Sequence, residues 1–240
     1  MSGTEARSHS RFPGLSQPGF DLVFGYVYTG LAVNICMAVA NAPLMLALVL
    51  VRDPAQAWPF FLLISPTVAP SIAAAFAAFE ASNAGGTSPF REFWRGWRRC
   101  LRPALVVGLA TAALALLVGV DLAATAARPA GALLAPVLLV VLAFAIVSAV
   151  LVLTGIATRD AAATVSVRAL AKASVYLVAR RWALGLLTLG TLVGACAFVL
   201  AQPVFGPLLG VAPLLFIAFS NARATLATPL RPRAKARVRA

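Results

Sequence analysis

The sequence has few of the residues that perform most enzyme chemistry. It contains seven acidic residues and a single histidine, His9, which lies in the polar N-terminal leader. Its three cysteines form no C-x-x-C pair, which excludes a disulfide scaffold and a thiolate metal site. We find no paired carboxylates, no Ser/His/Asp set and no phosphate-binding loop. These absences predict a protein that is not an enzyme and that holds no cofactor or metal.

Charge is also scarce, because 11% of the 240 residues are charged and 61% are hydrophobic. Soluble domains are about 25% charged and about 45–50% apolar, so the composition excludes an ordinary soluble protein. A helix needs about 20 apolar residues to cross a bilayer. Six stretches approach or exceed this length, at residues 22–51, 58–79, 103–120, 132–157, 182–200 and 204–220. The sequence therefore predicts an all-α polytopic membrane protein, with six transmembrane helices in one domain over residues 20–222.

Basic residues are distributed unevenly between the connections. Of the 20 lysines and arginines, all but Arg52 and Arg128 lie in the leader, in two of the connections or in the tail. Short basic loops stay in the cytoplasm, so this distribution predicts a plasma-membrane protein with six crossings and both termini cytoplasmic. The leader, residues 1–19, is predicted to be disordered. For the basic tail, residues 223–240, attraction to anionic inner-leaflet lipids is favoured over nucleic-acid binding.

The connection before the third apolar stretch has an amphipathic pattern. Ser88 followed by Pro89 is typical of a helix start. Aromatic residues then recur at helical spacing opposite a row of arginines, and the two sets are Phe90, Phe93, Trp94 and Trp97, and Arg91, Arg95 and Arg98. The pattern predicts an interfacial helix over residues 88–102, with its aromatic face toward acyl chains and its arginines toward water or headgroups. The alternative is that the aromatic face docks on a partner protein. A weaker amphipathic pattern covers residues 161–181.

Prolines and small polar residues interrupt the first two apolar stretches, at Asn34, Asn41, Pro43, Pro66, Thr67 and Pro70. A proline in a helix frees the carbonyl one turn earlier, and neighbouring hydroxyls often satisfy that carbonyl in membranes. For Pro66 this is the carbonyl of Leu62, with Ser65 or Thr67 placed to compensate. We favour locally repaired kinks, and the alternative is a binding site at broken helices near the membrane midplane.

The last two apolar stretches form a predicted antiparallel hairpin that contains two G-x-x-x-G pairs. Gly190 and Gly194 lie on the first helix, and Gly206 and Gly210 lie on the second. Counted from a turn near residues 200–203, the two pairs are predicted to lie at similar depth. Small residues at this spacing let helix backbones approach closely, so we interpret them as internal packing residues.

Three elements in this order resemble the YesL family of bacterial integral membrane proteins (domain of unknown function 624). Asn34 and Pro43 have the family's spacing, Thr67–Ala74 is similar to its T-x-x-P-x-x-A-A segment, and residues 93–98 are similar to its F-[FW]-R-x-[FW]-[KR] run. The resemblance covers roughly residues 20–125, and the remainder resembles the family in topology. This sequence departs from the family pattern by extra residues between Pro43 and Thr67.

Members of that family often accompany carbohydrate ABC-transporter permeases. The resemblance therefore implies a non-enzymatic accessory or regulatory role in sugar uptake, with permease subunits as partners. The alternative is a small stand-alone transporter or channel that uses the proline-broken first and second helices.

Overall fold

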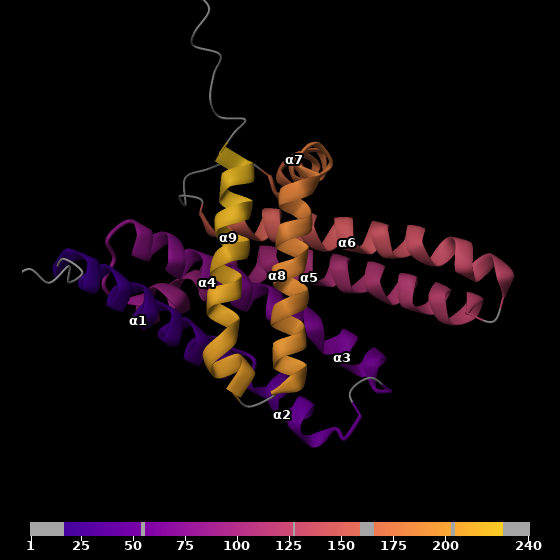
Figure 1. Cartoon of the computed structure of the whole chain (residues 1–240), viewed down its shortest axis with the longest axis horizontal. Coiled ribbons are helices and arrows are strands. Elements are labelled where there is room, and N and C mark those ends of the chain that lie inside the picture. Colours follow the sequence, from indigo (N-terminus) through magenta and orange to yellow (C-terminus); the bar gives the residue numbers. More distant parts are fainter. Residues whose placement is uncertain (1–16, 54–55, 127, 159–165, 203–204, 228–240) are drawn as a thin grey trace, which may run out of the picture.

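The structure is a computed structural model that describes residues 17–53, 56–126, 128–158, 166–202 and 205–227. Every regular element in these residues is a helix (Figure 1). The elements are α1 (Gln17–Ala40), α2 (Ala42–Leu50), α3 (Trp58–Ile64), η1 (Ser65–Thr67), α4 (Val68–Asn83), α5 (Pro89–Thr125), α6 (Pro129–Ala157), α7 (Val167–Arg180), α8 (Trp182–Ala201), η2 (Gly206–Gly210) and α9 (Val211–Ala227). The predicted leader and basic tail fall largely outside the described residues.

Five helical segments in the described ranges are long and apolar enough to cross a membrane. They are Trp58–Asn83, Pro89–Thr125, Leu133–Ala157, Trp182–Ala201 and Leu208–Ala227. The bent pair α1 and α2 makes a sixth candidate if it is counted as one span. The predicted fold class is therefore confirmed, and the chain is a multi-pass membrane protein. The last helix continues to Ala227, beyond the predicted end at residue 220.

The first predicted helix, residues 22–51, is not continuous. α1 ends at Ala40, α2 begins at Ala42, and their axes differ by 74°. Pro43 lies in the first turn of α2, where a missing N–H is tolerated, but it cannot donate to the carbonyl of Val39. Because no residue of α2 is buried, packing does not hold the two helices in line. The interruption expected near Pro43 is therefore a sharp bend between two helices.

The expected boundary between an interfacial helix at 88–102 and a spanning helix at 103–120 is also absent. α5 is one helix of 37 residues with Pro103 in its interior. Its buried positions include Phe93, Gly96, Cys100 and Ala104, so one packed face continues past the proline. At 1.5 Å per residue α5 is about 55 Å long, against a hydrocarbon core of about 30 Å. The basic N-terminal part of α5 therefore extends beyond its apolar part.

α4 is the central helix, since ten of its 16 residues are buried. α5 packs closely on α4 because Gly96 lies against Ala77 and Gly108 lies against Ala69. Figure 1 shows α4 and α5 behind the hairpin of α8 and α9, which runs across them. On the α9 side, Phe76 packs against Phe219 with ring centroids 5.4 Å apart. Small residues thus bring two backbones together on one side of α4, and aromatic rings fill the other.

A glycine turn joins α4 to α5. Gly85 has a φ of +87°, which L side chains rarely adopt. The N–H of Gly85 donates to the Ser82 carbonyl at 3.0 Å, and the N–H of Gly86 donates to the Ala81 carbonyl at 2.8 Å. This Schellman arrangement satisfies two terminal carbonyls of α4 and returns the chain to start α5.

The glycines of the α8–α9 hairpin pack differently from the prediction. A β-carbon at Gly206 would lie 2.8 Å from the Phe198 carbonyl oxygen, and one at Gly210 would overlap the Phe198 ring. Gly190 and Gly194 have no neighbouring atom within 4 Å of such a β-carbon. Gly206 and Gly210 therefore pack against Phe198 of α8. The expectation that Gly190 and Gly194 face them across the hairpin is wrong, because Phe198 fills that position.

Candidate functional site

The interruption at Pro66 is repaired locally. Ser65 Oγ donates to the Leu62 carbonyl oxygen at 2.8 Å, and Thr67 Oγ1 donates to the Ile64 carbonyl oxygen at 2.8 Å. The predicted compensation by Ser65 is thus confirmed. Pro66 is buried, and a β-carbon added at Gly108 of α5 would lie 2.9 Å from the Pro66 carbonyl oxygen. The break is therefore filled by α5. Pro70, one turn later, is also buried.

Asn34 makes a hydrogen bond between helices that are far apart in sequence. Its Oδ1 accepts from the backbone N–H of Ala212 at 2.7 Å, and the side chain is 2% exposed. The preceding turn, η2, is wound as a π-helix, and Pro213 follows Ala212. A π-turn changes the hydrogen-bond register of a helix, so a backbone donor at its end can bond to a side chain. Sequence analysis identified Asn34 but not its partner.

Asn41 lies at the bend between α1 and α2. Its Nδ2 donates to the Met37 carbonyl oxygen at 2.8 Å, while its Oδ1 is buried and has no partner among the described residues. The residue is 4% exposed. The two asparagines therefore differ, because Asn34 fastens α1 to α9, whereas Asn41 is bonded only to Met37 in the last turn of the adjoining α1.

The aromatic residues of the amphipathic segment do not all lie on one exposed face. Phe93 is fully buried in the protein core, so the expectation that it inserts among acyl chains is wrong. Trp94 and Trp97 are half-buried and contact each other with ring centroids 5.9 Å apart. Phe90 is 41% exposed. The reason is that α4 and α5 pack along this segment through Gly96, and this packing turns Phe93 inward.

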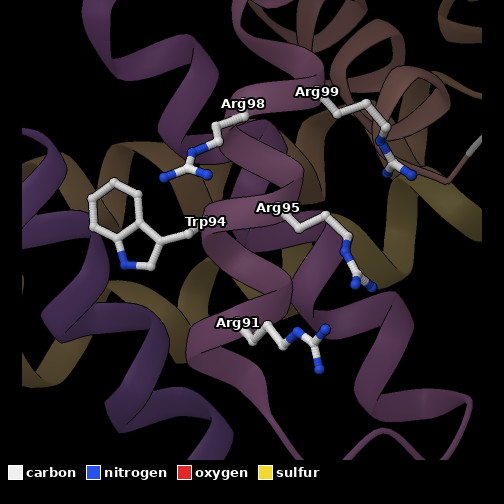
Figure 2. A pocket seen from close by; sticks show the side chains of 5 residues that line it. All are labelled: Arg91, Trp94, Arg95, Arg98 and Arg99. Carbon is white, nitrogen blue, oxygen red and sulfur yellow. The ribbon is translucent and has the colours of Figure 1, made fainter.

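The arginines of the same segment surround a hollow of about 580 Å³, which we call the arginine hollow. It is lined by Arg91, Trp94, Arg95, Arg98 and Arg99. Figure 2 shows Arg91, Arg95 and Arg99 directed to one side of the α5 ribbon, and Trp94 and Arg98 to the other. The side chains thus flank one exposed face of the helix.

Two of the four arginines in the hollow have partners. Arg95 Nη1 lies 3.0 Å from Glu92 Oε1 one turn earlier, and Arg99 Nη2 donates to the Ala157 carbonyl oxygen at 2.7 Å. Ala157 is the last residue of α6, and a cation there satisfies a terminal carbonyl and the helix dipole. Arg91 and Arg98 make no hydrogen bond or ion pair with any described residue.

Two further arginines fasten helix ends near the hollow. Arg223 Nη1 of α9 lies 2.8 Å from Glu80 Oε2 of α4. Arg181 Nη1, between α7 and α8, donates to the Ala224 carbonyl oxygen at 3.3 Å. Together with Arg99 they link α5 to the end of α6, the junction of α7 and α8 to α9, and α9 to the last turn of α4. We call this region the basic end. Charge counting located these arginines at one end but could not find their partners, because the partners are distant in sequence.

The described residues contain no group of three or more His, Cys, Asp or Glu side chains that could hold a metal ion. Comparison with protein-family models finds no match, and comparisons with curated proteins and with solved structures find no significant similarity.

Proposed function

We propose that this multi-pass membrane protein is a non-enzymatic accessory or regulatory component of a carbohydrate ABC transporter. The observation that carries the proposal is the basic end, where Arg99, Arg181 and Arg223 fasten helix ends into a fixed surface. Next to them Arg91 and Arg98 are exposed and have no partner among the described residues. A fixed surface with unpaired charge can orient a partner and select it by electrostatic complementarity.

The proposal places the basic end and both termini in the cytoplasm. Its support is the distribution of basic residues, which leaves Arg52 and Arg128 as the exceptions among 20. Reporter fusions after Ala240 and near Gln56 test this orientation. The expected result is a cytoplasmic signal from the first fusion and an extracytoplasmic signal from the second. An extracytoplasmic signal from the Ala240 fusion contradicts the orientation.

Affinity purification from native membranes in mild detergent tests the accessory role. We expect a sugar permease and its ATPase to be recovered in stoichiometric amounts with the tagged chain. A tagged, unrelated multi-pass protein of similar size is the control for detergent-induced association. Recovery of the chain alone, in a detergent that keeps other ABC transporters assembled, contradicts the accessory role.

A stand-alone transporter or channel is the second candidate function. It is favoured by the 74° bend between α1 and α2, where Asn41 Oδ1 is buried and has no partner in the part of the chain that the structure describes. Discontinuous helices with free polar groups form substrate sites in transporters. Solute flux in liposomes that contain only this chain tests the candidate. Flux that Asn41→Leu abolishes supports it, and an absence of flux for a panel of sugars and ions removes it.

A further inference from the structure

We draw no further inference here: the strongest candidate, the exposed apolar face of α8 on which Gly190 and Gly194 leave open space, is a stripe of small residues, and nothing in the part of the chain that the structure describes shows what covers it.

Discussion

A proline interrupts the helical chain at Pro43 and at Pro66, but only the interruption at Pro43 separates two sharply angled helices. Around Pro66 the helix is interrupted by η1, but α3, η1 and α4 still form one candidate span of 26 residues. Around Pro43 the axes of α1 and α2 differ by 74°. A proline removes a single helix hydrogen bond in either place. The difference must therefore come from what surrounds each proline.

Two surroundings distinguish the interruptions. Ser65 and Thr67 donate to the carbonyls of Leu62 and Ile64, each at 2.8 Å. Pro66 itself is buried against Gly108 of α5. α2, which follows Pro43, has no buried residue. Packing against a neighbour thus keeps a broken helix in line, and without it the helix turns away.

The largest loss of stability is expected when a side chain is added at Gly108, where α5 packs against Pro66. Gly108→Leu places side-chain atoms where the Pro66 backbone lies 2.9–3.1 Å from the new β-carbon. Because backbone cannot move aside as a side chain does, we expect a loss of about 3 kcal/mol in the free energy of unfolding. Thermal unfolding in detergent measures it. The matched control Gly190→Leu, which meets no atom within 4 Å, is expected to change stability by less than about 0.5 kcal/mol. Equal losses in the two variants would show that Gly108 does not support the break.

The second largest effect is expected at the anchor of α1 before its bend. Asn34→Leu leaves the buried N–H of Ala212 without an acceptor, and an unsatisfied buried group costs about 1–3 kcal/mol. Asn41→Leu is expected to cost less, because the Met37 carbonyl keeps its bond from the Asn41 backbone N–H at 2.9 Å and the lost Oδ1 has no partner among the described residues. Unfolding of the two variants by heat or denaturant gives the comparison. A larger loss for Asn41→Leu contradicts the assignment of Asn34 as the anchor.

A smaller effect is expected from the hydroxyls beside Pro66. Ser65→Ala with Thr67→Val removes the hydroxyl donors to the Leu62 and Ile64 carbonyls, and we expect a loss of about 1 kcal/mol in stability. Spin labels at the exposed Leu63 and at Ser82 measure whether the bend there increases. Ser220→Ala is the control. Ser220 Oγ also donates to a backbone carbonyl, that of Phe216 at 2.8 Å, but no proline lies between these two residues. If the label distance is unchanged in the double variant, packing alone keeps the segment in line.

The smallest effect on stability is expected at Pro43. Pro43→Ala restores an N–H donor to a helix without buried residues, so stability should change by less than about 0.5 kcal/mol. The angle between α1 and α2, which is 74° in the structure, should decrease clearly. Spin labels at the exposed Leu31 and Leu50 should move apart toward about 29 Å, the span of 19 residues in a straight helix. An unchanged distance would show that Pro43 does not cause the bend.

Much of the molecule could be predicted from the sequence, because the relevant physics is local. Apolar length specifies which segments cross a bilayer, and each span found in the described residues overlaps a predicted stretch, although several ends differ. The repair of the Leu62 carbonyl by Ser65 was predictable because donor and acceptor are three residues apart. The arginines of the hollow were predictable as one exposed face because helical spacing groups them.

Contacts between distant segments were decided by the tertiary structure. Asn34 and Ala212 are 178 residues apart, and no pattern in the sequence pairs them. The amphipathic pattern of residues 88–102 could not tell whether Phe93 faces lipid or protein, since both environments are apolar. Its burial follows from Gly96 meeting Ala77 of α4, a fit of surfaces that depends on helix orientation. Hydrophobicity thus specifies which segments enter the membrane, and close packing of small residues specifies which faces meet, because lipid and protein interiors are nearly equally apolar.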